Sequence, residues 1–476
     1  MSGLIIKRIF WSFGAVAELF LFSGVAFGFP FIEYELKSEG IFYETKCSNG
    51  TDDIWGPGKK LCNDALKLYN TLFTVAVVSC TIGVFLTGFI LDKIGMFWTR
   101  MFYCTITTLG YVMMALYTSN ELLLFPGLVF LAWSGLAYLV INNVCVSIMG
   151  RFAGVSVIIF SGTTFFMMPY AMPGKEWAEG NFLRSNIVSK CQKVGENSEI
   201  KEEKSEKNEP EKEKIPLKES CLNPTFLLFA TVFVVYSTRV KALQGWIYPW
   251  MEWSYAKVPG DGAEIEAHVG NLLEIYGLLL FASPLFAALP ELFSWVGSKL
   301  NRNGILNGDM ISLTIIMSYS AIACSVCSGQ MMYRAKDLDD NANAYALIVI
   351  FSIAKTIVYA APNMFLFYMF PPEHFGSLYG ILTAPGIVTM WFIDPLFRLI
   401  LGDSESLADA DFAPVSIGFA VLCGVGLVQV FLPKIGLIPA AKRMCRERQI
   451  QSERTNEESH GIDNKGFELE KSEDMF

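Results

Sequence analysis

The sequence contains few charged residues and very few histidines. Only 17% of its 476 residues are Asp, Glu, Lys or Arg, and there are three His. A soluble protein of this size needs more polar side chains than this to cover its surface. The shortage of charge therefore excludes an ordinary soluble domain.

Motifs of enzymes, primary pumps and nucleic-acid binders are also missing. There is no G-x-x-x-x-G-K-[ST] phosphate loop, no H-E-x-x-H zinc motif and no serine elbow. The net charge of −9 includes no basic stripe that would bind nucleic acid. Cys324 and Cys327 have CxxC spacing, but they lie in an apolar run without a second pair or a nearby His. We therefore expect no enzyme activity, no metal, no cofactor and no nucleic-acid partner.

Long apolar runs are what the sequence has instead. Hydrophobic residues make up 53% of the chain, and a helix that spans a bilayer needs roughly 20 of them in succession. The composition and the runs predict an all-α polytopic membrane protein with eleven spans. The predicted spans are residues 10–32, 69–91, 97–117, 122–149, 152–172, 225–250, 272–296, 309–329, 343–370, 375–401 and 413–435.

Two polar segments divide the chain. Residues 174–224 include a run rich in Lys, Glu and Ser, which predicts a charged cytosolic loop that is available to cytosolic partners. Residues 437–476 are predicted to be a cytosolic tail. The loop separates an N-terminal bundle of five spans, residues 1–173, from a C-terminal bundle of six spans, residues 225–436.

The distribution of basic residues predicts the orientation. Lys7 and Arg8 precede the first span and place the N-terminus in the cytosol, so residues 33–68 form an outer loop. That loop carries Asn49 in a glycosylation sequon, and Cys47 and Cys62 within it can form a disulfide in an oxidising compartment. The C-terminus is predicted to be cytosolic as well.

The number of spans conflicts with this orientation. Six C-terminal spans ending in the cytosol place residues 174–224 in the cytosol, in agreement with their lysines. Five N-terminal spans that start in the cytosol would place the same loop outside. Two apolar runs meet near Arg151 with almost no connector. Either one helix is absent from this chain, or one run does not cross fully.

A charged loop follows the second predicted span. Residues 88–100 read GFILDKIGMFWTR, with Gly88, Asp92, Lys93, Gly95 and Arg100 at fixed spacing. The segment resembles the cytoplasmic loop signature of the major facilitator superfamily, G-x-x-x-D-[RK]-x-G-x-x-x-x-R. The resemblance implies a two-bundle fold in which Gly95 makes a tight turn and the charged residues latch helix ends in one conformation.

A second segment is more specific. Residues 370–380 read FPPEHFGSLYG and resemble the F-P-x-[EN]-H-F-G-x-L-x-G segment of solute carrier family 43. Glu18 in the first span, followed by the sequence FGFP at residues 27–30, agrees with the same family. The family contains facilitative carriers of large neutral amino acids and an equilibrative purine nucleobase transporter. Residues 86–89 and Glu373 are closer to the nucleobase member.

The resemblance implies twelve helices and a location in the plasma membrane. In the family pattern a fifth helix follows the stretch that corresponds to residues 147–152. Here Arg151 and Phe152 pass directly into a run that resembles the sixth helix. The resemblance therefore implies that the fifth helix of the family pattern is missing from this chain, at the place where the orientation conflict occurs.

Charged residues inside the spans are the first candidates for contact with a solute, because burying them in a membrane is costly. They are Glu18, Arg239 and Lys355. In a two-bundle carrier Glu18 and Arg239 could face each other across the central cavity, or they could form a structural ion pair. Lys241 has the alternative of extending to the membrane surface.

Aromatic and amide side chains are the second candidates. Trp133 and Tyr359 could stack on a flat purine or enclose a large apolar group, while Asn143 and Asn363 could supply hydrogen bonds. Packing between helices is the alternative role for each. Residues 246–250 read WIYPW near a helix end, where an aromatic belt at the membrane surface is the simpler expectation.

Facilitative transport of a small neutral organic solute by alternating access is the leading functional hypothesis. The solute would be a purine nucleobase or a large neutral amino acid. The alternative is a regulatory or scaffold membrane protein that lacks one helix and does not transport.

Overall fold

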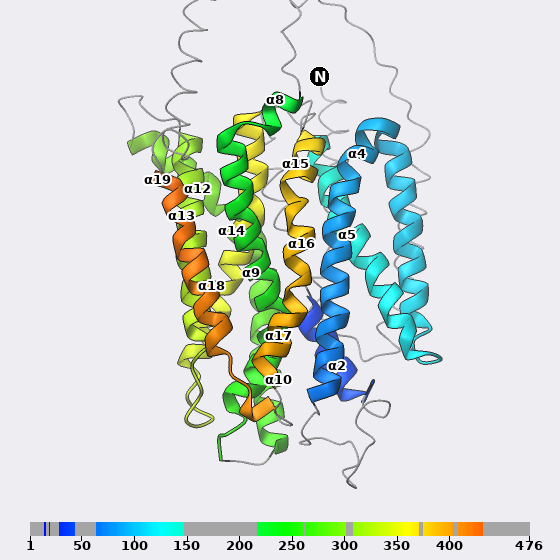
Figure 1. Ribbon diagram of the computed structural model, residues 1–476, viewed down its shortest axis with the longest axis vertical. Coiled ribbons are helices and arrows are strands. Elements are labelled where there is room, and N and C mark those ends of the chain that lie inside the picture. Colours follow the sequence, from blue (N-terminus) through cyan, green and yellow to red (C-terminus); the bar gives the residue numbers. More distant parts are fainter. Residues whose placement is uncertain are drawn as a thin grey trace, which may run out of the picture.

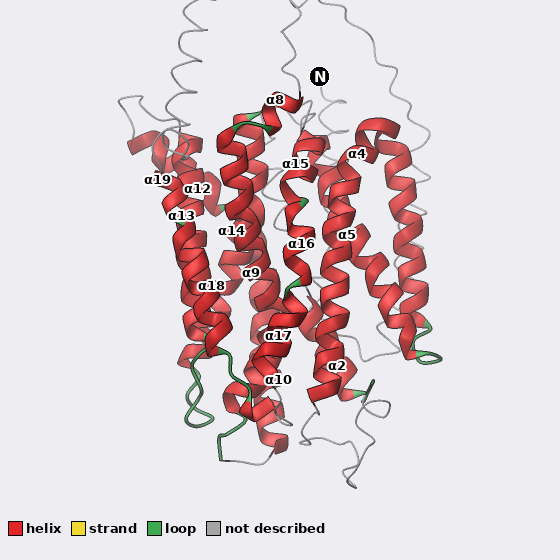
Figure 2. Cartoon of the chain, viewed as in Figure 1, coloured by secondary structure: helices red, strands yellow, loops and turns green. Residues whose placement is uncertain are grey.

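A computed structural model describes residues 14–15, 19, 28–42, 63–146, 217–259, 262–300, 308–370, 375–402 and 407–431. These residues form helices joined by short loops, and they contain no strand (Figure 2). The longer helices are α2 (Phe29–Ser38), α4 (Asn63–Ala115), α5 (Leu124–Val146), α9 (Pro224–Tyr255), α10 (Gly262–Phe281), α12 (Leu289–Leu300), α13 (Gly308–Gln330), α14 (Ala342–Met369) and α18 (Ala413–Gly426). The shorter elements are η2 (Glu121–Leu123), α8 (Leu217–Cys221), α11 (Ser283–Ala287), α15 (Phe375–Thr383), α16 (Pro385–Trp391), α17 (Ile393–Leu401), η5 (Leu407–Asp409) and α19 (Val428–Phe431).

Six predicted spans correspond to helices that are long and apolar enough to cross a membrane. These helices are Asn63–Leu91, Glu121–Asn142, Pro224–Tyr255, Ser312–Gln330, Ala342–Leu366 and Phe375–Leu401. Their agreement with the sequence confirms a polytopic helical protein. The total of eleven spans stays a prediction, because residues 152–172 and most of residues 10–32 lie outside the described residues.

Three predicted spans are divided among shorter helices, and one of them is 375–401, which consists of α15, α16 and α17. The run 272–296 is divided among α10, α11 and α12, and α10 begins ten residues earlier, at Gly262. Pro284 and Pro290 fall at the breaks, where a missing N–H and a fixed φ interrupt helical hydrogen bonding. The run 413–435 is likewise divided between α18 and α19. The predicted ranges did not include these breaks.

The turn predicted at Gly95 is present inside α4. Gly95 has φ 78° and ψ 171°, a conformation that is not helical and that favours glycine. The chain reverses there, and the second half of α4 corresponds to the predicted span 97–117 (Figure 1). We call the end of the molecule that contains this turn the Gly95 end, and the opposite end, where α2 stops, the Ser38 end.

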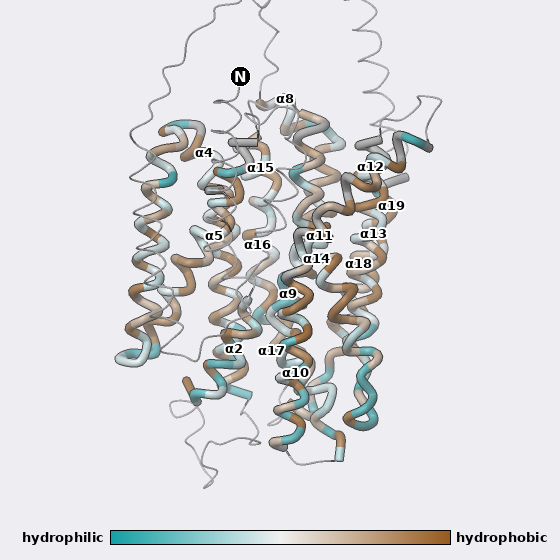
Figure 3. Tube along the Cα trace, turned by 180° about the vertical axis from the view of Figure 1, so that it is seen from behind, coloured by the Kyte–Doolittle hydropathy of each residue, from teal (hydrophilic) through white to brown (hydrophobic). Residues whose placement is uncertain are grey.

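The helices lie in two groups (Figure 1). Helices α2, α4 and α5 form the N-terminal group, and helices α9 to α19 form the C-terminal group, with α15, α16 and α17 placed next to α4. Hydrophobic residues run along the helices, and hydrophilic residues gather in the loops at the Ser38 end (Figure 3). This arrangement places much of α9 and α4 at the boundary between the groups.

Two ends of the described chain meet on the same side. Arg100, near the Gly95 turn, donates a hydrogen bond to Asn142, four residues before α5 ends at Val146. Helix α8, which begins at Leu217, also lies at the Gly95 end (Figure 1). The end of α5 and the start of α8 therefore both lie at the Gly95 end.

Candidate functional site

Helix α9 carries two buried cations that point in opposite directions. Arg239 and Lys241 are two residues apart, which places them about 200° apart around a helix. Arg239 is 1% exposed and Lys241 is 5% exposed, although both lie within a candidate membrane span. Their different partners show which side of α9 belongs to the boundary between the groups.

Arg239 points into the C-terminal group. Its Nε donates to Ser328 Oγ at 2.7 Å, and its Nη2 lies 3.1 Å from the sulfur of Met331. The guanidinium also lies over the ring of Phe419, 5.1 Å from the centroid. These contacts come from α13 and α18, so the structure places Arg239 among C-terminal helices. Glu18 lies outside the described residues, and the predicted approach of the two side chains stays a prediction.

Lys241 points toward the N-terminal group. Its Nζ donates to Thr81 Oγ1 of α4 at 2.8 Å, well inside both helices. Among the described residues, no carboxylate forms an ion pair with Lys241. Cys80 lies within electrostatic range of Lys241 and of the candidate Tyr359. Lys241 therefore places a buried amino group in the middle of the boundary instead of extending to the membrane surface.

The same face of α9 continues toward both ends. Thr238 shares a 2.7 Å hydrogen bond with Thr389 of α16. Gly245 lies so close to Phe73 of α4 that a Cβ on it would be 2.4 Å from the ring. Tyr248 follows one turn later and packs edge-on against Tyr34 of α2. The sequence shows the helical spacing of these residues, but it does not show which helix they contact.

The aromatic residues near the end of α9 do not form a belt at the membrane surface. Trp246, Tyr248 and Trp250 are each at most 1% exposed. Trp246 Nε1 donates to Asn70 Oδ1 of α4 at 3.0 Å, and Trp250 Nε1 donates to the carbonyl of Met331 at 3.0 Å. The belt expectation is wrong because each indole N–H finds an acceptor inside the protein.

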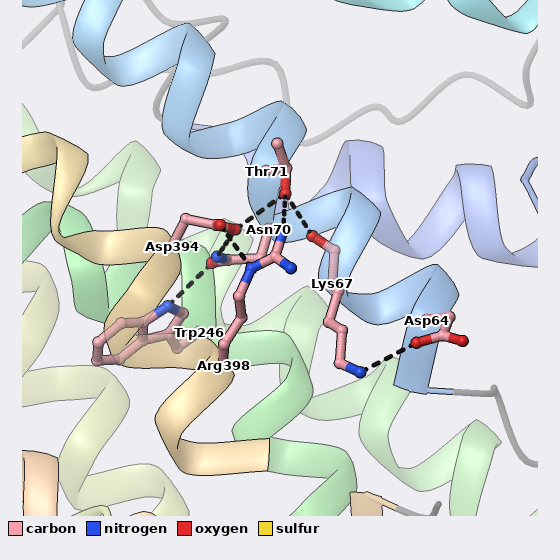
Figure 4. A network of polar contacts seen from close by, with 7 residues as sticks. All are labelled: Asp64, Lys67, Asn70, Thr71, Trp246, Asp394 and Arg398. Carbon is pink, nitrogen blue, oxygen red and sulfur yellow. Dashed lines mark hydrogen bonds and ion pairs between the residues drawn. The ribbon is translucent and has the colours of Figure 1, made fainter. Parts of the chain in front are cut away.

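A polar network joins the groups toward the Ser38 end (Figure 4). Asp394 of α17 accepts hydrogen bonds from Asn70 Nδ2 at 3.0 Å and from Thr71 Oγ1 at 2.9 Å. Its other oxygen accepts from Arg398 Nε at 2.8 Å. Because Asn70 also receives the indole of Trp246, one carboxylate and one amide connect α4 with α9 and α17.

A second connection lies between α2 and α9. Lys37 forms an ion pair with Glu252, and Tyr248 Oη donates to the same carboxylate at 3.1 Å. The Lys37 ammonium also lies 5.5 Å from the centroid of the Tyr248 ring. The ion pair of Lys37 with Glu252 was not predicted from the sequence. Residues 33–68 were expected to form a loop, whereas α2 continues to Ser38.

Three predicted site residues lie on successive turns of α14. Lys355, Tyr359 and Asn363 are all at most 4% exposed. Lys355 Nζ lies 3.4 Å from Tyr276 Oη, and the Tyr276 ring stacks on Phe31 of α2 at 6.0 Å. Pro362 lies inside α14 and does not interrupt it. Lys355 is therefore linked to α2 through one intervening side chain, that of Tyr276.

The charged loop signature is only partly described. Gly88 lies against the backbone of Gly376 in α15, where a Cβ would be 2.3 Å from the carbonyl oxygen. Lys93 is exposed, and Arg100 binds Asn142. The side chain of Asp92 lies outside the described residues, so the predicted latch stays a prediction.

The remaining predicted residues stay predictions or take packing positions. Trp133 is half-buried beside Gly83, where a Cβ would be 2.0 Å from the indole. The backbone of Asn143 belongs to α5, but its side chain lies outside the description. Asn49, Cys47 and Cys62 also lie outside the described residues.

Comparison with known proteins gives one informative similarity. No family model matches the chain. The chain is 20% identical over 441 residues to equilibrative nucleobase transporter 1 of Bos taurus, and the match covers 81% of this chain and 88% of that protein. This distant similarity extends over most of both chains and favours a transporter of small solutes over an enzyme.

Proposed function

We propose that this protein is a facilitative carrier that moves a small neutral organic solute across a membrane by alternating access. The observation that carries the proposal is the contact between Lys241 and Thr81, which places a buried ionisable side chain at the boundary of the two helix groups. An ionisable group at this depth is costly and usually marks a solute or ion pathway. The similarity to a nucleobase transporter supports the same conclusion.

The chemistry of the contact favours a solute with hydrogen-bond acceptors. Lys241 has three N–H donors and a single hydroxyl partner, and it forms no ion pair among the described residues. A carbonyl oxygen or a ring nitrogen of a solute can replace the Thr81 hydroxyl without breaking an ion pair. A purine nucleobase offers such acceptors on a flat ring, and a large neutral amino acid offers a carboxylate. The ammonium would repel a cationic solute.

Uptake of labelled adenine and labelled leucine by vesicles containing the purified protein tests the proposal. We expect saturable uptake of one of them, and Lys241→Met should reduce it about tenfold or more, because a hydrogen bond to a charged group contributes about 1.5–3 kcal/mol. Lys257→Met is the matched control, since Lys257 is 59% exposed and pairs only with Asp409. No uptake of either solute, or equal uptake by the two variants, would contradict the proposal.

The direction of the helices favours keeping a second candidate, a regulatory membrane protein that does not transport. The end of α5 and the start of α8 both lie at the Gly95 end, whereas the sequence predicts one crossing, 152–172, between them. Sequencing the native transcript across the codons for Met149 to Val155 tests this candidate. A dominant longer form with about 30 additional codons, one span and its connectors, would assign transport to that form. If the short form alone occurs and moves no solute, the regulatory function is favoured.

A further inference from the structure

Glu33 of α2 is a buried carboxylate with an unsatisfied oxygen. Its side chain is 2% exposed, and Oε2 has no hydrogen-bond partner. An ionised carboxylate in such a position would lose hydration without gaining a donor at Oε2, which costs several kcal/mol. A protonated carboxyl group avoids most of this cost.

The neighbouring lysine does not neutralise Glu33, because it is paired elsewhere. Lys37 forms its ion pair with Glu252, which also receives the hydroxyl of Tyr248. Two carboxylates therefore lie near one ammonium, and that ammonium forms its ion pair with Glu252. The titratable groups that act on this cluster are Tyr69 of α4, Tyr248 and Glu252 of α9, and Glu266 of α10, together with Lys37 on α2 itself.

The cluster lies between the two groups of helices. Glu33 and Lys37 belong to the N-terminal group, and Glu252 belongs to the C-terminal group. Stacking of Phe31 on Tyr276 and packing of Tyr34 on Tyr248 close the same region. Separation of the groups at the Ser38 end would expose Glu33 to water and separate Lys37 from Glu252.

We propose that Glu33 is a proton-binding site which loads when the two helix groups close at the Ser38 end. On closure a proton from water binds a carboxylate oxygen of Glu33, and on opening the same proton returns to water. Closure at this end therefore depends on the pH of the solution that the end faces. The consequence for solute movement rests on the carrier function proposed above, whereas the proton site itself does not.

The direction of the pH dependence follows from the surroundings of Glu33. Burial, and then the charge of Glu252, raise the pKa of Glu33 well above its usual range, and Lys37 opposes them. In the open state the exposed carboxyl has an ordinary pKa of about 4.3. The closed state is therefore favoured fully below the open-state pKa and loses this advantage as the pH rises through the raised value. Between the two values the equilibrium changes by up to about tenfold per pH unit for one proton.

Chemical labelling measures closure without requiring transport. Thr74 of α4 is 1% exposed and lies one turn beyond Asn70, so a cysteine at this position becomes reactive when the Ser38 end opens. Purified protein in lipid nanodiscs carrying Thr74→Cys is treated with a polar maleimide from pH 5 to 8. Ser119→Cys, at an exposed position, corrects for the change in thiol reactivity with pH.

We expect the corrected labelling rate to rise with pH, by as much as tenfold per unit within the window. Glu33→Gln should make labelling slow and independent of pH, because a neutral amide needs no proton. Glu252→Gln should also remove the dependence, because Lys37 is then available to Glu33. Glu264→Gln, which removes an exposed charge from α10, should leave the dependence intact.

The possible outcomes separate this proposal from the carrier function. A labelling rate without pH dependence in the unsubstituted background, or a dependence that survives Glu33→Gln and Glu252→Gln, would overturn the proton site. A dependence that Glu33→Gln removes, in a protein that moves neither adenine nor leucine, would support the proton site while the carrier function fails.

Discussion

The contact between Gly88 and Gly376 makes a prediction about stability that can be worked out from distances. A Cβ at Gly88 would lie 2.3 Å from the carbonyl oxygen of Gly376 and 2.8 Å from its carbonyl carbon. Both atoms belong to backbone, which cannot move aside as a flexible side chain can. Since nonbonded atoms prefer about 3.5 Å, α4 and α15 would have to separate by about 1 Å.

The expected effect of Gly88→Ala is therefore unfavourable. Overpacking of this kind costs typically 1–3 kcal/mol, and the gain from replacing a helical glycine offsets about 0.5–1 kcal/mol of it. At the middle of these ranges the net effect is about 1 kcal/mol, or roughly a 5- to 10-fold change in the equilibrium that holds the two helices together. The same separation would weaken the closed contact between the two groups near the Gly95 end.

Thermal unfolding of the purified protein in detergent checks this estimate. We expect Gly88→Ala to unfold at a lower temperature than the unsubstituted protein. Gly418→Ala is the matched control, because Gly418 is an exposed helical glycine with no atom within 4 Å of its added Cβ. Equal stability of the two alanine variants would refute the close contact of α4 with α15 and the reasoning built on it.

Three further predictions concern charge, packing and glycosylation. Asp394→Asn should speed maleimide labelling at Thr74→Cys several-fold, because Asn70 and Arg398 lose a carboxylate acceptor; a rate equal to that of the aspartate form would contradict a closing role. Arg239→Met should lower the unfolding temperature without changing the KM for solute, because the Arg239 contacts described here lie within the C-terminal group. A raised KM with normal surface expression would instead support the solute-binding role predicted from the sequence. Asn49→Gln should increase electrophoretic mobility as endoglycosidase treatment does, and mobility that neither treatment changes would exclude a glycan at the sequon.

The positions of most described helices could be predicted because their signals are local. The apolar run of α14 and the glycine that turns α4 at Gly95 are both visible in short windows of sequence. The breaks around Pro284 and Pro290 have a local signal too, because proline lacks the N–H of a helical hydrogen bond. That signal alone does not decide the outcome, since α14 continues through Pro362.

The candidate site could be predicted only in part, because its contacts join residues that are distant in sequence. Helical periodicity alone places Arg239 and Lys241 on opposite faces of α9, but it does not tell which face meets α4. The answer depends on Thr81, which is 160 positions away in the chain. Arg239 was therefore preferred over Lys241, although Lys241 is the one that points across the boundary. Glu33 was missed for a similar reason, since a carboxylate just beyond a predicted span is ordinarily solvated.

The number of crossings can be judged by two independent routes. From the lysines of residues 174–224 and the basic residues after residue 441, the sequence predicts that both segments are cytosolic, which six C-terminal spans allow and five N-terminal spans do not. Helix direction gives the second route: α5 ends and α8 begins at the Gly95 end. A chain that leaves and returns on one side of a bilayer crosses it an even number of times. Charge and direction therefore both predict an even total. The eleven spans predicted from hydropathy stay a prediction, because two of them lie largely outside the described residues.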